Sequence, residues 1–243
     1  MWVFIHKIAS PRTCYQWSGK ILPGLIACLL LTAVYGLLGG LWLAPVDYQQ
    51  GEVYRIMYIH VPSAIWSLGT YVIMAVSALL FLVWKIKVAD LVAKLCAPIG
   101  AAFTFLALIT GSIWGKPTWG TWWIWDARLT SELILLFIYG GIMALRSAIP
   151  EKQLAAQITS ILILVGLINI PIVHFSVNWW QTLHQGASIL RLGAPTIAPA
   201  MLYPLLSMIA AFFFYILVIL TIGLRYELLQ REHHTRWVQE LFI

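Results

Sequence analysis

A tryptophan-rich segment at 114–128, which reads WGKPTWGTWWIWDAR, carries the most unusual side chains of the sequence. It holds five of the 13 tryptophans, namely Trp114, Trp119, Trp122, Trp123 and Trp125. Tryptophan favours the membrane–water interface, but belt residues are normally spread among aliphatic ones, and here indole dominates. If 118–128 is helical, positions 119, 122, 123 and 126 share one face, because they follow helical spacing. This aromatic floor suits a large, flat ligand, for which a porphyrin and a quinone ring are both candidates.

Two histidines could bind a metal at the centre of such a ligand. His60 lies in YIHVPSAIW and His184 lies in NWWQTLHQG. Imidazole is a common ligand of haem iron, so one histidine on each side of a planar macrocycle would fill both axial positions. The alternative is that both are ordinary interfacial residues. A third, His174, lies late in an apolar stretch, where a lone histidine is more often a satisfied polar group than a ligand.

The composition places these residues in a membrane protein. The 243 residues are 61% hydrophobic and only 10% charged, whereas soluble domains carry about 25% charged residues. A bilayer core of about 30 Å needs about 20 mostly apolar residues as helix. We therefore predict an all-α integral membrane protein, a single six-span domain over 1–243 with a short amphipathic tryptophan-rich outer segment. The predicted spans are 21–43, 59–84, 95–113, 129–146, 158–177 and 200–223, and the first is expected to be a retained anchor.

Lysine and arginine predict how this domain is oriented. With the N-terminus inside, eleven of the 15 basic residues fall in inner segments and four fall in outer ones, namely Arg55, Lys116, Arg128 and Arg191. Cytoplasmic loops carry such an excess, so both termini are predicted to be cytoplasmic. His60, His184 and the tryptophan-rich segment then lie on the same outer side. The net charge of +6 reflects this bias, and no dense basic run suggests nucleic-acid binding.

Polar residues on the predicted outer side could complete the site. A porphyrin such as haem carries two carboxylates, and arginine can pair with a carboxylate through two hydrogen bonds. Arg55 lies near His60 in sequence, and Arg128 ends the tryptophan-rich segment. Ordinary interfacial anchoring is the alternative role for each. Asp47, Asp126 and Glu132 could orient the histidines or arginines.

The depth of the histidines separates two functions. Transmembrane b-type cytochromes bury their histidine pairs within the spans, which keeps haem inside the bilayer. His60 and His184 are both predicted at the outer lip, from which a ligand could pass to a partner. This position favours haem handling over a haem- or quinone-binding redox subunit. A structural subunit with belt tryptophans remains a third alternative.

Five segments together resemble one known family. WGTWWIWDARLTSELILLF at 119–137 resembles the WWD signature of haem-handling membrane proteins. Four others look like the haem exporter protein C family, also called cytochrome c maturation protein C: PVDYQQG at 45–51, YRIMYIHVPSAIW at 54–66, APIGAAFTF at 97–105 and NWWQTLHQG at 178–186. The match covers nearly the whole chain in order, and the region beyond Leu190 departs most from it.

The resemblance implies where a cargo of haem b would bind. It implies a site at the periplasmic face of a bacterial inner membrane, over the WWD segment, with His60 and His184 as axial ligands of the iron. Trp114, Trp119 and Trp123 fall in the pocket by position, and Trp122, Trp125 and Asp126 belong to the same signature. The family's polar outer positions are matched by Asp47, Gln50, Arg55 and Arg128.

The resemblance also implies partners. The family delivers haem to a membrane-anchored haem chaperone, maturation protein E, for the biogenesis of c-type cytochromes. A small single-span protein D assists, and subunits A and B form an ABC transporter. The ATP-binding pattern GxxxxGK[ST] is absent from this chain, so ATP hydrolysis would occur in a partner. We expect a transport component and not an enzyme.

Overall fold

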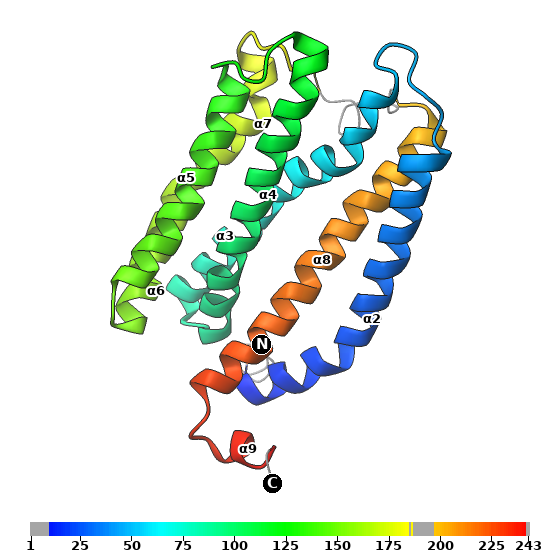
Figure 1. Ribbon diagram of the computed structural model, residues 1–243. Coiled ribbons are helices and arrows are strands. Elements are labelled where there is room, and N and C mark those ends of the chain that lie inside the picture. Colours follow the sequence, from blue (N-terminus) through cyan, green and yellow to red (C-terminus); the bar gives the residue numbers. More distant parts are fainter. Residues whose placement is uncertain (1–9, 185, 187–196, 242–243) are drawn as a thin grey trace.

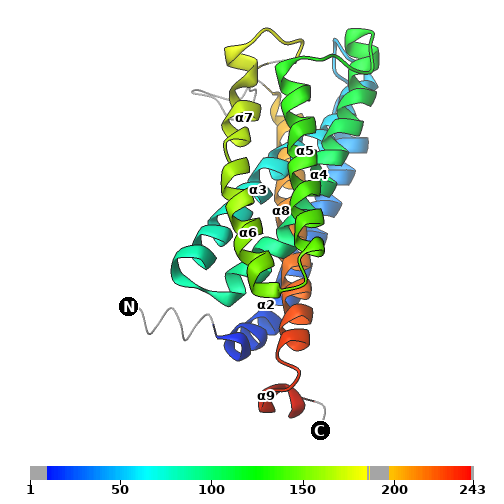
Figure 2. The same cartoon turned by 90° about the vertical axis from the view of Figure 1, so that its left-hand side faces the viewer.

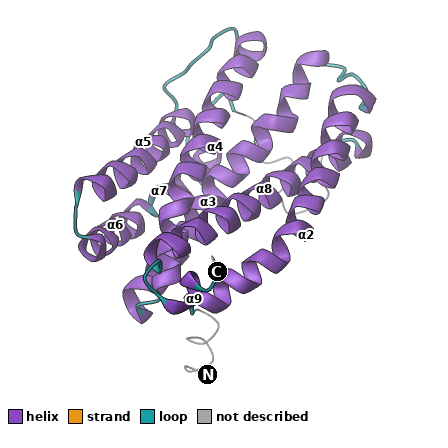
Figure 3. Cartoon of the chain, turned by 60° about the horizontal axis from the view of Figure 1, so that its bottom comes forward, coloured by secondary structure: helices purple, strands orange, loops and turns teal. Residues whose placement is uncertain are grey.

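The computed structural model describes residues 10–184, 186 and 197–241. Long helices dominate, and no strand occurs among these residues (Figure 3). The elements in order are α2 (Pro11–Leu38), η1 (Gly39–Leu43), η2 (Glu52–Ile56), α3 (Met57–Trp84), α4 (Lys87–Trp119), α5 (Ala127–Ala148), α6 (Lys152–Gly166), α7 (Asn169–Trp179), α8 (Pro199–Arg231) and α9 (Arg236–Gln239).

Six helical stretches are long and apolar enough to cross a membrane, which confirms the predicted fold class. They are Pro11–Leu43, Glu52–Trp84, Lys87–Trp119, Ala127–Ala148, Lys152–Trp179 and Pro199–Arg231. Most run past the predicted apolar stretches, because polar residues continue the same helix beyond the apolar part. The first begins at Pro11, whose fixed φ suits a helix start, after Ser10 has capped it by accepting the Thr13 N–H.

The helices pack as two groups (Figures 1 and 2). α2 lies along α8, and α3 and α4 form a second close pair, which α5 and α6 cover on one side. The core of this second group contains the fully buried Tyr71 and Tyr139. Tyr139 donates a hydrogen bond to the Ser67 carbonyl of α3 at 2.7 Å, and Tyr71 donates to the Ile163 carbonyl of α6 at 3.0 Å. These bonds fix α3 against both α5 and α6.

The fifth span is interrupted between α6 and α7 (Figure 2). Pro171 lacks a backbone N–H, and its ring excludes the carbonyl of residue 167 from a normal helical position. Gly166 precedes the interruption, and a Cβ there would lie 2.2 Å from the Tyr71 hydroxyl. The buried Asn169 side chain donates to the Ser131 carbonyl at 3.0 Å, which fixes α7 to α5. The interruption therefore sets the position of α7, which precedes the His184 segment.

The bundle has two chemically different ends. We call the end that carries His60 and His184 the histidine end, and the end that carries Arg146 and Arg231 the arginine end. α2 begins and α8 ends at the arginine end (Figure 1). Which end faces the cytoplasm stays a prediction from the basic residues.

Candidate functional site

His60 lies in the first turn of α3 and is fixed against α4. Its Nδ1 lies 3.0 Å from the Ala107 carbonyl and 3.1 Å from the Thr110 hydroxyl. A carbonyl only accepts hydrogen bonds, so Nδ1 carries the proton and donates. The Thr110 hydroxyl itself donates to the Leu106 carbonyl at 2.6 Å, which leaves its lone pairs toward the imidazole. The lone pair of His60 therefore lies on Nε2, the nitrogen that a metal would need.

Gly111 allows His60 to lie this close to α4. A Cβ at position 111 would be 2.9 Å from His60 Cε1, closer than real Cβ contacts. The glycine therefore provides space for an imidazole that two hydrogen bonds already hold. The sequence alone does not reveal this role of Gly111, because its only signal there is a glycine inside an apolar helix.

His184 lies opposite His60 although the two are far apart in sequence. The centres of their imidazole rings are 6.5 Å apart, and the ring planes differ by 36°. His184 follows α7 in a non-helical segment, 180–184, and is half-buried. The structure thus brings together the two histidines that the sequence selected as a pair.

Two of the predicted tryptophans pack edge-on against these imidazoles. Trp114 contacts His60 with ring centres 5.6 Å apart, and Trp119 contacts His184 at 6.1 Å. Both come from the last two turns of α4. Trp114 Nε1 donates to the Gln50 side-chain carbonyl at 2.7 Å, which fixes the indole. Gln50 itself lies in a turn in which Asp47 Oδ1 accepts the N–H groups of Gln49 and Gln50.

A cavity of about 400 Å³ lies between these side chains. Small-molecule sites span roughly 300–1,000 Å³ and are mostly apolar with a few polar groups, and this cavity has that character. α3, α4, α5 and α7 supply most of its lining. The lining includes Gln50, His60, Ala64, Ile65, Leu68, Leu108, Gly111, Trp114, Trp119, Arg128, Leu129, Glu132, His174 and His184.

Arg128 and Glu132 are the charged residues among the described lining of the cavity. They are one turn apart on α5, and a helix rises about 6 Å over four residues, so Glu132 lies deeper. Arg128 donates to the Val173 carbonyl of α7 at 2.8 Å. The buried Glu132 accepts from the Ser67 hydroxyl of α3 at 2.8 Å. His174 also lines the cavity, although the sequence favoured a satisfied polar group there.

The helix over 118–128, on which the shared face depended, does not form. α4 ends at Trp119, because Gly120 adopts a left-handed conformation with φ of +79°. Residues 121–126 are not helical, and α5 begins after Asp126, whose side chain accepts the Leu129 N–H at 2.8 Å. The single face expected for Trp119, Trp122, Trp123 and Asp126 therefore does not form.

The remaining predicted site residues lie outside the cavity lining. Trp122 and Trp125 are 57% and 75% exposed, and Trp123 has a buried Nε1 for which no hydrogen-bond partner is found in the described part of the chain. Arg55 is half-buried and donates to the carbonyls of Gly40 and Ala44, at 2.6 and 3.0 Å, beside its ion pair with Glu52. Its predicted contact with a haem carboxylate stays a prediction. Arg191 lies outside the described residues.

These features define a multi-pass membrane protein with a ligand cavity lined by histidine and tryptophan at one end of its bundle. Comparison with known proteins agrees with this class. The sequence pattern of the family described as "Heme exporter protein C" matches residues 4–239. The chain is 49% identical to heme exporter protein C of Haemophilus influenzae over 241 residues, covering 99% of this chain and 98% of the relative.

Two further relatives extend the comparison. The chain is 47% identical to heme exporter protein C of Escherichia coli K12 over 243 residues, which cover this whole chain and 98% of the relative. A ccmC-like mitochondrial protein of Marchantia polymorpha, named for cytochrome c biosynthesis, is 52% identical over 187 residues, 77% of this chain and 78% of that protein. The chain therefore belongs to the heme exporter protein C family, which confirms the resemblance seen in its sequence.

Proposed function

We propose that the cavity binds haem as cargo and that the chain is a transport component in the biogenesis of c-type cytochromes. The observation that carries the proposal is the pair of imidazoles across the cavity. Metal–imidazole nitrogen bonds are about 2 Å long, so two imidazoles on opposite sides of one metal have ring centres on the order of 6 Å apart. The 6.5 Å between His60 and His184 fits such a pair. Family membership supports haem as the ligand.

The other lining residues fit the rest of a haem molecule. Trp114 and Trp119 offer aromatic surface beside the two imidazoles, and aliphatic residues of α3 and α4 face the apolar part of the cavity. Arg128 would pair with one haem carboxylate, because it is the cation among the described lining residues. Glu132, one turn deeper, would disfavour a carboxylate at the far end of the cavity. Haem would therefore bind with its carboxylates toward the start of α5.

The two proposed ligands are held differently, and this difference would allow release. His60 is part of a helix and is bonded to a second helix, whereas His184 lies in the non-helical segment 180–184. A partner that displaced this segment would remove one axial ligand and open the cavity edge. We infer that the partner is the haem chaperone, maturation protein E, at the periplasmic face of a bacterial inner membrane. Protein D and the ABC transporter subunits A and B would complete the complex.

Absorption spectra of the purified chain and its variants test the proposal. Wild type purified from haem-replete cells should show a Soret band of six-coordinate haem. His60→Ala and His184→Ala should each lose this spectrum, whereas His174→Ala, the matched control in the same cavity, should keep it. Unchanged spectra in both of the first two variants would contradict the ligand assignment.

Transfer to the chaperone tests the second part of the proposal. Haem-loaded chain mixed with the purified chaperone should lose haem to it, and His184→Ala should lower the transfer. If the loaded chain instead keeps its haem and cycles between ferric and ferrous states with added redox partners, a redox subunit is the better description.

A further inference from the structure

The position of His184 depends on contacts outside the cavity. His184 lies five residues beyond the end of α7, in the non-helical segment 180–184. The Thr182 hydroxyl accepts the His184 backbone N–H at 3.1 Å. This small turn, in which a hydroxyl bonds a backbone group two residues later, is a known local motif. It fixes the backbone that carries the imidazole.

Asp126 connects this turn to α5. One carboxylate oxygen, Oδ1, accepts the Leu129 N–H at 2.8 Å and caps α5. The other, Oδ2, accepts a hydrogen bond from the Thr182 hydroxyl. The hydroxyl thus donates to a carboxylate and accepts from a backbone amide, so Asp126, the Asp of the WWD signature, is linked to His184 through Thr182.

A second contact fixes the same two regions to each other. Arg128, two residues after Asp126, donates to the Val173 carbonyl of α7. The first turn of α5 therefore holds α7 and the segment after it at two points. Neither Asp126 nor Thr182 lines the cavity, so their contribution to a bound ligand would be indirect.

We propose that Asp126 and Thr182 are positioning residues that set the place of the His184 imidazole. The proposal rests on the proposed function, in which His184 is an axial ligand of haem iron. It gives a role to Thr182, which lies outside the WWD signature. It also means that Asp126 supports His184 through Thr182 and does not contact the ligand itself. A charge-assisted hydrogen bond such as that between Thr182 and Asp126 is stronger than a neutral one, which makes it suitable for holding a segment that has little helical support.

Thr182→Val tests this because valine keeps the shape and removes the hydroxyl. We expect the iron of bound haem to shift partly from six- to five-coordinate. Haem should also dissociate roughly tenfold faster, measured by its capture by apohaemoglobin, as expected for the loss of a hydrogen bond to a charged group. Thr182→Ser should restore the wild-type spectrum. Thr130→Val, which removes a threonine hydroxyl from the same end of α5, is the matched control and should change neither quantity.

A variant of Asp126 separates its two contacts. Asp126→Ser keeps a good helix cap for α5 but has no second oxygen for Thr182. It should reproduce the Thr182→Val spectrum, and the double variant should be no worse than either single one, because both remove the same contact. Added effects in the double variant would contradict a shared contact.

The outcomes separate this inference from the proposed function. If Thr182→Val keeps the spectrum and the dissociation rate while His184→Ala loses the axial ligand, the positioning role is wrong and the haem site stands. If His184→Ala also leaves the spectrum unchanged, the ligand assignment itself fails. Far-ultraviolet circular dichroism and gel filtration of each variant show that any change is not a loss of folding.

Discussion

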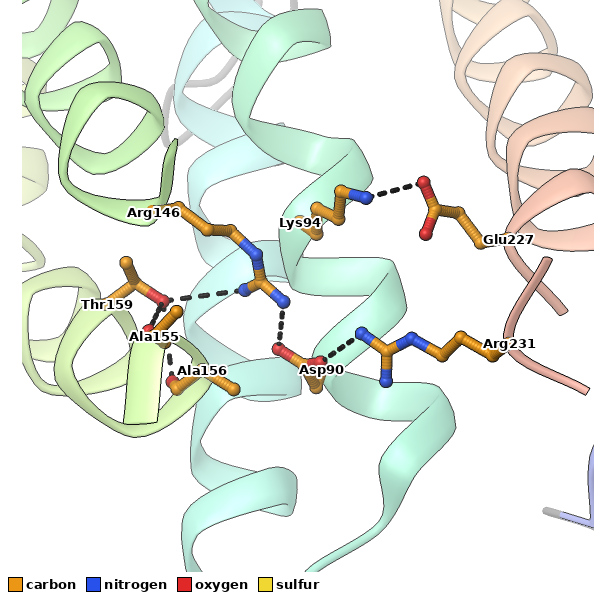
Figure 4. Close-up of polar contacts among 8 residues, drawn as sticks. All are labelled: Asp90, Lys94, Arg146, Ala155, Ala156, Thr159, Glu227 and Arg231. Carbon is orange, nitrogen blue, oxygen red and sulfur yellow. Dashed lines mark hydrogen bonds and ion pairs between the residues drawn. The ribbon is translucent and has the colours of Figure 1, made fainter. Parts of the chain in front are cut away.

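The two ends of the bundle use buried polar residues differently. At the arginine end, Asp90 of α4 is 2% exposed and accepts from Arg146 of α5 at 2.6 Å and from Arg231 of α8 at 2.8 Å (Figure 4). Arg146 also reaches the Thr159 hydroxyl of α6 at 3.4 Å. One carboxylate therefore joins helices of both groups.

At the histidine end, polar side chains face a cavity. His60, Arg128 and Glu132 each make one or two bonds to neighbouring helices, and each still lines the cavity. Their remaining hydrogen-bonding or ligating capacity is available to a ligand. The arginine end joins the helices through a buried, paired carboxylate, whereas polar groups at the histidine end face the cavity in which we propose that haem binds. Variants at the two ends should therefore fail in different ways.

The largest effect on stability should come from Asp90→Ala. Removing one partner of a buried ion pair leaves an uncompensated charge and costs about 3–5 kcal/mol, and here two arginines lose their partner. Thermal unfolding in detergent should show a much lower Tm, while protein that remains folded should keep the wild-type haem spectrum. A changed spectrum with an unchanged Tm would reverse the comparison.

Arg128→Gln should produce the opposite pattern. If Arg128 pairs with a haem carboxylate as proposed, the variant loses a charged hydrogen bond worth about 1.5–3 kcal/mol, so haem affinity should fall roughly tenfold to a hundredfold. Haem titration measures this change. Arg55→Gln is the matched control, because its guanidinium is bonded to the Gly40 and Ala44 carbonyls. Equal losses of affinity in both variants would support the carboxylate contact that the sequence predicted for Arg55.

Gly111→Ala should disturb the site by crowding. The new methyl group would lie 2.9 Å from His60 Cε1, and overpacking typically costs about 1–3 kcal/mol. The imidazole must shift from its bonds to Ala107 and Thr110, so the haem spectrum should change. Gly140→Ala, where a Cβ meets nothing within 4 Å, is the control. A normal spectrum in Gly111→Ala would show that the ring can move without loss of ligation.

Lys94→Ala should have the smallest effect. Lys94 pairs with Glu227 of α8 at 2.5 Å, but its side chain is 39% exposed (Figure 4). Partly exposed ion pairs contribute about 0–1 kcal/mol, so Tm should fall only slightly and haem binding should not change. A loss as large as that of Asp90→Ala would mean that the whole arginine end acts as one network.

The sequence predicted the spans and the pairing of distant histidines for simple reasons. Apolar length alone identifies six spans, and alternation of spans places His60 and His184 on one side. The family resemblance placed Trp114 and Trp119 in the pocket, and both line the cavity from the last two turns of α4. The sequence does not show which outer residues face the cavity, because this depends on the path of the segments that connect the helices.

Other features depended on contacts that local sequence does not reveal. The tryptophan spacing would give a shared face only if 118–128 were one helix, but Gly120 ends α4 and Asp126 caps the start of α5. Gly111 and Thr182 give no distinct signal in the sequence. Gly111 matters because it leaves space for His60, and Thr182 matters because its hydroxyl bonds Asp126; both partners are distant in sequence. Asp90 gives no signal in the sequence either, because Arg146 and Arg231, which it joins, also fit the excess of basic residues expected in cytoplasmic loops.

The interruption between α6 and α7 has a consequence for motion. Because α7 is separated from α6, the path from Asn169 to His184 can open without separating the whole fifth span from the bundle. Local unfolding of such units requires less free energy than global unfolding. We expect amide hydrogens of α7 and of residues 180–184 to exchange with deuterium faster than those of α4, and bound haem to slow them. The opening rate of this short unit would then set the upper limit on how often the protein can release its cargo.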